Sequence, residues 1–138
     1  MRTAIDTNII SALWSSEPAS NDIAKKLFDA KKRGALVIAA PVYAELFAYP
    51  NANREFIERF LRDSQIEVDF VLSETVWLKA AESFADYSKR RRKSKAGQAK
   101  RLLVDFIIGS HALYEANQLM TLDKNRYLTG FPDLKITA

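Results

Sequence analysis

The chain has 138 residues, the usual size of a single domain with one hydrophobic core, and 28% of them are charged. It has no cysteine and a single histidine, His111, which excludes disulfides, thiolate metal sites and chemistry based on paired histidines. The net charge of +4 favours a polyanionic partner, with nucleic acid the simplest candidate. No apolar run approaches the roughly 18 residues that cross a membrane, so we expect a cytoplasmic protein without a membrane partner.

Hydrophobic periodicity predicts strands that alternate with helices along the whole chain. Four strands and a candidate fifth are predicted, at Arg2–Ile5, Leu36–Ala40, Val68–Leu72, Gln118–Thr121 and Leu134–Thr137. Helices are predicted at Asn8–Trp14, from a Ser20 or Asn21 cap to Gly34, from Pro41 to just before Pro50, at about Asn53–Arg62, from Ser73 into the basic stretch, and at Leu102–Asn117.

This alternation is typical of an open, mostly parallel sheet between two layers of helices. We therefore expect one three-layer α/β/α domain over residues 1–138, with a sheet of four or five strands. In such folds, ligands bind beyond the carboxyl ends of the strands. Acidic residues that directly follow a predicted strand are for this reason the first candidates for a functional site.

Four acidic residues stand at such places. Asp6 follows the first strand, Glu45 lies one turn into the helix after the second, and Asp123 follows the fourth strand. Each could simply be a helix cap or a turn residue, because acids are favoured there. Asp105 is harder to explain in this way, since it interrupts the apolar run Leu102–Ile108 and charged side chains are rarely enclosed without a partner.

Together, the four acids would converge on one edge of a parallel sheet. A cluster of like charges is unfavourable when empty, because each carboxylate raises the pKa of its neighbours. A hard divalent cation removes this repulsion, and magnesium accepts carboxylate and water oxygens. Such a cation can stabilise the charge on a reacting phosphate and activate a water molecule, so phosphodiester hydrolysis would need no histidine.

The motifs around these acids resemble those of PIN domains. The residues that carry the resemblance are Ala4–Asn8, Ala44–Leu46, Val104–Ile108 and Thr121–Asp123, with Tyr127 after the last motif. Their order and spacing match over essentially the whole chain. The resemblance is strongest to VapC-like ribonuclease toxins of toxin–antitoxin pairs.

This resemblance implies an endoribonuclease that uses Mg²⁺, with Mn²⁺ as a substitute, and that forms a homodimer inhibited by a cognate antitoxin. It further implies that Asp6, Glu45, Asp105 and Asp123 are the catalytic, metal-binding carboxylates, and that Thr7, Asn8, Thr121 and Asn125 are supporting polar groups. Asn125 stands where some relatives carry a further acid, so mechanisms with one and with two metal ions stay open.

A dense basic stretch from Lys89 to Arg101 leads toward Asp105. It can be a solvated helix end, or it can contact the phosphates of an RNA substrate and make binding sensitive to salt. The residues predicted to bind RNA are Arg90, Arg91, Arg92, Lys93, Lys95, Lys100 and Arg101. We expect the lone His111 to be a surface or packing residue, because nothing near it in sequence pairs with it.

Three other readings of the sequence stay open. A phosphatase that forms an aspartyl-phosphate would need a second acid at Asn8. A signalling receiver domain would need an acceptor aspartate after the third strand, where the chain has Leu72 and Ser73. A PIN-like RNA-binding protein without catalytic activity is the third, and the four acids argue against it.

Overall fold

The computed structural model describes residues 1–16, 18–94 and 100–138 and contains one five-stranded sheet. Its strands run in the order β3-β2-β1-β4-β5, and every pair of neighbours is parallel. This confirms the predicted α/β class and the fifth strand. The strand bounds are Thr3–Ile5 (β1), Leu36–Ala39 (β2), Ile66–Asp69 (β3), Gln118–Met120 (β4) and Ile136–Thr137 (β5).

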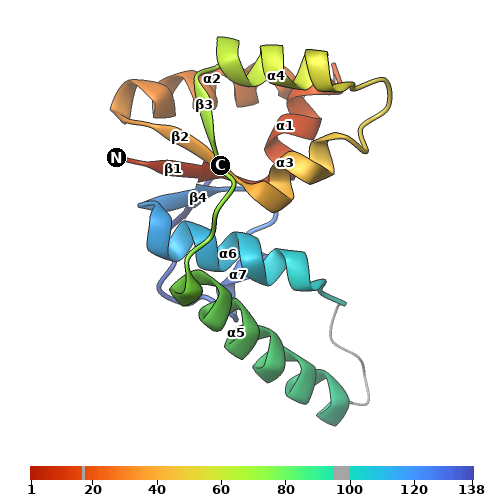
Figure 1. Ribbon diagram of the computed structural model, residues 1–138, viewed down its shortest axis with the longest axis vertical. Helices are drawn as coiled ribbons and strands as arrows, with labels where there is room; N and C mark the ends of the chain where they lie inside the picture. Colours follow the sequence, from red (N-terminus) through yellow and green to blue (C-terminus); the bar gives the residue numbers. More distant parts are fainter. Residues whose placement is uncertain (17, 95–99) are drawn as a thin grey trace.

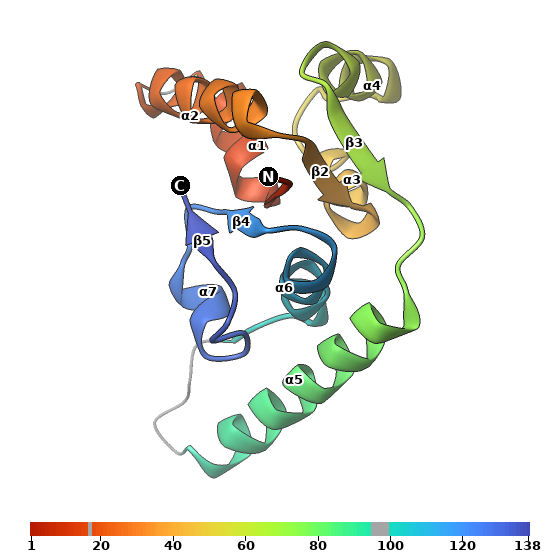
Figure 2. The ribbon, with the colours of Figure 1, turned by 90° about the vertical axis from the view of Figure 1, so that its left-hand side faces the viewer.

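Helices cover both faces of the sheet, as the predicted three layers require (Figure 1). Figure 2 shows α1 and α2 on one side of the strands and α5 and α6 on the other. No helix in the described part of the chain is both long and apolar enough to cross a bilayer. The helix bounds are Thr7–Trp14 (α1), Ala19–Arg33 (α2), Ala40–Leu46 (α3), Arg54–Asp63 (α4), Glu74–Lys93 (α5), Leu103–Glu115 (α6) and Asn125–Leu128 (α7).

The two central strands, β1 and β2, are buried along their whole length. Helices on both faces exclude water from them, which is why the apolar run of β2 has no polar alternation. Both strands end at the edge where α1 and α3 begin, and β4 ends beside them. From β1 the chain adds β2 and β3 on one side, whereas β4 and β5 lie on the other side of β1. The strand order therefore reverses between β1 and β4, and this edge is the topological switch point of the sheet.

Three local predictions were wrong. The third strand starts at Ile66 instead of Val68, because it pairs in register with β2; the apolar Phe70 and Val71 beyond it are exposed. Helix α2 begins after Pro18, not at a Ser20 or Asn21 cap. The short helix α7 was not predicted, because its four residues are too few for helical periodicity to be visible.

The predicted start of α5 at Ser73 is confirmed, and Asn53 caps α4 in the same way. The Asn53 side chain accepts a hydrogen bond from the backbone N–H of Phe56, and the Ser73 hydroxyl accepts one from Val76. Both residues have extended backbones and satisfy an N–H that has no partner within the helix. The caps define where each helix starts, so the chain leaves the sheet at a fixed position.

His111 is a packing residue, as expected. It is 1% exposed on α6, and its Nε2 atom lies 2.8 Å from Asp69 Oδ2 at the end of β3. The Arg2 guanidinium reaches the same carboxylate and also pairs with Glu67 at 3.0 Å. This polar group connects β1, β3 and α6 and has no contact with the acids that follow β1 and β4 among the described residues.

A prediction about packing concerns Gly109 in α6. A Cβ atom there would lie 2.4 Å from Phe131 Cε2, a contact too short for the ring to tolerate without moving. We expect Gly109→Ala to destabilise the protein by about 1–3 kcal/mol, although alanine is the better helix former. Gly130→Ala is the control, since its Cβ would meet Phe106 at an ordinary 3.4 Å. Equal denaturation midpoints for the two variants would contradict this.

Candidate active site

Asp6 is the buried centre of a hydrogen-bond network at the switch point of the sheet. It follows β1 directly, is 1% exposed, and caps α1 by accepting a hydrogen bond from the Thr7 N–H at 2.8 Å. Its second oxygen, Oδ2, accepts hydrogen bonds from the Thr121 hydroxyl at 2.8 Å and from the Tyr127 hydroxyl at 2.7 Å. Asn8 adds a longer bond to the same oxygen at 3.4 Å.

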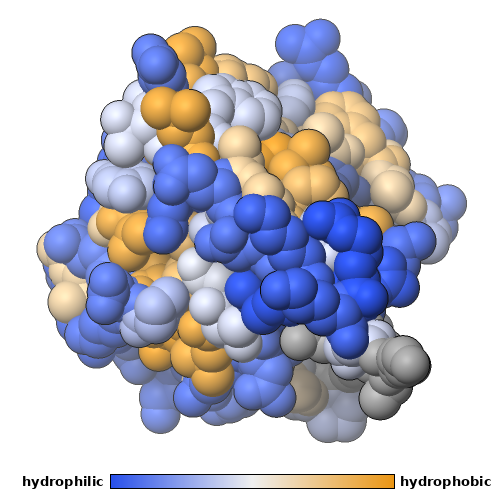
Figure 3. All heavy atoms as spheres, turned by 90° about the horizontal axis from the view of Figure 1, so that it is seen from below, coloured by the Kyte–Doolittle hydropathy of each residue, from blue (hydrophilic) through white to orange (hydrophobic). Residues whose placement is uncertain are grey.

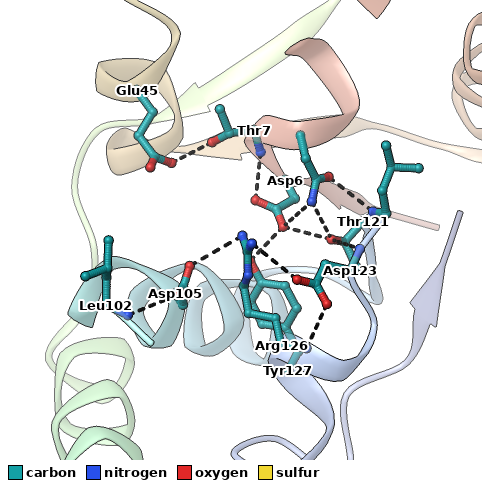
Figure 4. A network of polar contacts seen from close by, with 11 residues as sticks. Asp6, Thr7, Glu45, Leu102, Asp105, Thr121, Asp123, Arg126 and Tyr127 are labelled. Atoms are coloured by element: carbon teal, nitrogen blue, oxygen red, sulfur yellow. Dashed lines mark hydrogen bonds and ion pairs between the residues drawn. The ribbon is translucent and has the colours of Figure 1, made fainter. Parts of the chain in front are cut away.

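Two further acids lie around the side chain of Arg126 (Figure 4). The Arg126 guanidinium is 3.2 Å from Asp123 Oδ2 and 3.7 Å from Asp105 Oδ1. Asp105 is on α6 and its side chain is 13% exposed, whereas Asp123 follows β4. The structure thus brings three of the four predicted acids to one edge: Arg126 pairs with Asp105 and Asp123, and the Thr121 hydroxyl links Asp123 to Asp6.

Each of these three acids also accepts a hydrogen bond from a backbone N–H at the start of a helix. One Asp105 oxygen accepts a hydrogen bond from the Leu102 N–H at the start of α6, and one Asp123 oxygen accepts from the Arg126 N–H in α7. In Asp6, Asp105 and Asp123 alike, one oxygen serves the helix and the other is directed to the shared network. Each acid therefore satisfies a backbone N–H at the start of a helix and also takes part in the shared network.

Glu45 lies at the exposed edge of this group of acids. It is exposed on α3, and its Oε1 atom accepts a hydrogen bond of 2.6 Å from the Thr7 hydroxyl. Thr7 donates its backbone N–H to Asp6, so one residue connects the two carboxylates. Sequence reasoning placed Glu45 and Thr7 at this edge correctly, although no direct contact joins Glu45 to the other three acids within the described residues.

The supporting polar residues divide into two groups. The Thr121 hydroxyl accepts a hydrogen bond from the Asp123 N–H and donates to Asp6, and Asn8 donates to Thr121 and accepts from Leu122. Asn8 and Thr121 thus hold the end of β4 against the start of α1. Asn125 differs, since it is exposed at the start of α7 and makes no hydrogen bond to the four acids within the described residues.

Arg126 and the hydroxyl of Tyr127 are functional neighbours that sequence reasoning missed. Burial lowers the pKa of Arg126, but attraction to Asp105, to Tyr127 and to Asp6 outweighs it and raises the pKa. Burial, together with the charge and hydrogen bond of Asp6, raises the pKa of Tyr127 far above its usual range, so this hydroxyl stays a donor. The one available signal was the spacing of Arg126, three residues after Asp123 in a short helix.

The comparisons with known proteins agree with this geometry. A family model described as PIN domain matches residues 3–131, which include all four acids. The chain belongs to the PIN domain family. This match confirms the resemblance first seen in the four motifs and, with it, the expected fold. Among curated protein sequences, none matches this chain.

Three solved structures share the PIN fold of this chain over nearly its whole length. A chain of VapBC2 from Rickettsia felis, bound to a DNA fragment from their promoter, has 21% identity and a TM-score of 0.72, with 99% and 98% of the two chains covered. A chain of VapBC-1 from nontypeable Haemophilus influenzae has 24% identity and a TM-score of 0.68, with 99% and 97% covered. A chain of a toxin–antitoxin complex from Klebsiella pneumoniae has 15% identity and a TM-score of 0.60, with 99% and 96% covered.

The acids of this PIN domain suit a divalent cation by chemical type, because carboxylate oxygens are the ligands of Mg²⁺ and Mn²⁺. Among residues 1–16, 18–94 and 100–138, however, no three Asp, Glu or His side chains lie close enough together to hold a metal ion. Arg126 lies between Asp105 and Asp123 and supplies the positive charge there. It therefore reduces the repulsion that was expected for an empty cluster.

The basic residues predicted to bind RNA lie around the end of α5 and the start of α6. Seen from below, strongly hydrophilic side chains cover the middle of this face (Figure 3). Arg91, Arg92 and Lys100 are exposed and line a groove together with Arg101, and Lys93 is exposed at the end of α5. Arg90 is half-buried, and Lys95 lies outside the described residues.

Proposed function

We propose that the chain is a divalent-cation-dependent endoribonuclease that hydrolyses RNA phosphodiester bonds. The observation that carries this proposal is the convergence of Asp6, Asp105 and Asp123 on one edge of the sheet around a single cationic group. Carboxylates that lie near one another at one edge of a sheet favour a small hard cation. The PIN family membership supports the same reaction class.

Asp6, Asp105 and Asp123 would hold the cation, and Glu45 would complete the set from the rim. When bound, Mg²⁺ or Mn²⁺ supplies charge stabilisation for the reacting phosphate and a lower pKa for the attacking water. The chain positions the ligands: Tyr127 and Thr121 orient one Asp6 oxygen, and Thr7 orients Glu45. Burial and the charge of Asp6 raise the pKa of Tyr127, so its hydroxyl is a hydrogen-bond donor at neutral pH.

A role as the toxin of a toxin–antitoxin pair is the second part of the proposal. Three structural relatives with the same fold come from two VapBC complexes and a toxin–antitoxin complex. We infer a single PIN domain over residues 1–138 that acts in the cytoplasm, forms a homodimer and binds a cognate antitoxin. Exposed apolar side chains such as Phe28, Phe56 and Trp77 offer surface for protein contacts.

Cleavage of a generic single-stranded RNA tests the proposal. We expect cleavage with millimolar Mg²⁺ or Mn²⁺, its loss in excess chelator, and its return when the cation is added back. Calcium is a useful control, because it binds carboxylates with longer bonds and looser geometry and should support little cleavage. Full activity in chelator would reject the metal mechanism, and cation-independent RNA binding without cleavage would favour the non-catalytic alternative.

A further inference from the structure

A small pocket lies beside the acid cluster, on the other side of Arg126. It has a volume of about 170 Å³ and is formed by the end of α5, the residues before α6, and α7 with the turn after it. Arg90, Arg101 and Arg126 are in its wall, together with Tyr87, Phe106, Asn125, Thr129 and Gly130. The wall therefore carries three guanidinium groups and no carboxylate, which is the charge pattern of an anion site.

The pocket wall contains one buried hydrogen-bond donor that no acceptor of the described residues satisfies. The Arg90 Nε atom is buried and has no hydrogen-bond partner within residues 1–16, 18–94 and 100–138. A buried donor without a partner costs free energy, so a ligand that accepts its hydrogen bond would be bound favourably. The backbone N–H of Arg101 donates to the Tyr87 hydroxyl at 2.6 Å, which fixes the opposite wall. Thr129 and Asn125 add neutral polar groups.

We propose that this pocket binds a phosphate group of the RNA backbone, next to the phosphate that is cleaved. The inference rests on the proposed nuclease function and adds the subsite that positions its substrate. Arginine forks match phosphate oxygens with paired hydrogen bonds, and the pocket volume suits one phosphate rather than a base with its sugar.

Arg126 connects this pocket to the acids. Its guanidinium lies in the pocket wall and also pairs with Asp123 at 3.2 Å and with Asp105 at 3.7 Å. A phosphate in the pocket competes with these carboxylates for the same N–H donors. When Arg126 turns to the phosphate, Asp105 and Asp123 lose their positive partner and become free for a cation. RNA and the divalent cation should therefore each strengthen the binding of the other.

The test compares two neighbouring charges on α5. Lys89 is exposed and lines neither this pocket nor the groove beside it, so Lys89→Gln removes one charge without touching the pocket. We expect Arg90→Gln to weaken binding of a labelled single-stranded RNA about tenfold in chelator, and Lys89→Gln to weaken it less than about twofold. Arg90→Lys should fall between them, because it keeps the charge but loses the fork.

Pyrophosphate is the second probe, and its binding is measured as the rise in melting temperature that it causes. Wild type and Lys89→Gln should be stabilised to the same extent, and Arg90→Gln much less. Equal effects of Arg90→Gln and Lys89→Gln on both probes would overturn the pocket and leave a general basic surface. Absence of RNA cleavage, with the difference between the two variants intact, would instead reject the proposed function and retain the phosphate site.

Discussion

Asp6→Asn should lower RNA cleavage about a hundredfold or more, because it removes the buried charge at the centre of the acid cluster. Asp105→Asn should have an effect of similar size. The amide that replaces Asp6 can still accept from the Thr7 N–H and can donate to the Tyr127 hydroxyl, so the fold should survive. Initial cleavage rates at saturating Mg²⁺ measure the loss, with melting curves to confirm folding.

The matched control is Asp133→Asn, which removes one negative charge from an exposed position outside the cluster. It should leave the cleavage rate within about twofold of wild type, since exposed charges are screened by water and salt. In cells, wild-type expression should stop growth, whereas Asp6→Asn should not. Toxicity that persists in Asp6→Asn would reject the toxin-nuclease proposal.

Arg126→Gln should have opposite effects on the protein without and with its cation. Without the cation, Asp105 and Asp123 lose their positive partner, and we expect the melting temperature to fall by about 4 °C, equivalent to roughly 1 kcal/mol. With the cation, a competing positive charge is gone, and Mn²⁺ should bind about tenfold more tightly. The rise in melting temperature on adding Mn²⁺ should therefore be larger in the variant than in wild type.

Lys124→Gln provides the comparison, because Lys124 is exposed next to the same helix and forms no ion pair among the described residues. Its melting temperature in chelator and its Mn²⁺ affinity should stay close to those of wild type. If Arg126→Gln bound Mn²⁺ no better than Lys124→Gln does, Arg126 would not occupy the place of the cation. Titration calorimetry or the paramagnetic resonance of free Mn²⁺ gives both affinities.

The strands and long helices could be predicted because their signals are local. The apolar run of β2 and the amphipathic pattern of α4 are visible in a few residues. The start of β3 could not be found in this way, since its bounds come from pairing with β2 and not from its own composition. Helix α7 was missed for a related reason: one turn has no period.

The residues of the site also differ in whether a local sequence signal reveals them. Asp6, Glu45 and Asp123 could be found because each follows a strand, and parallel strands end at a common edge. Arg126 could not be assigned a role, because its meaning depends on the distance to Asp105, a residue in another helix. The buried partner of Asp6 at Tyr127 likewise depends on how α7 folds back, which no local pattern encodes.

Asp6 and the residues that hold its carboxylate lie far apart in the sequence, so they are synthesised at different times. Asp6 is made before its partners Thr121 and Tyr127, which follow 115 and 121 residues later in the chain. Domains fold as their chain emerges, and β1 has only β2 beside it until β4 has been made. Under the proposed nuclease function, the nascent chain therefore lacks its complete site until residues 118–127 have been made.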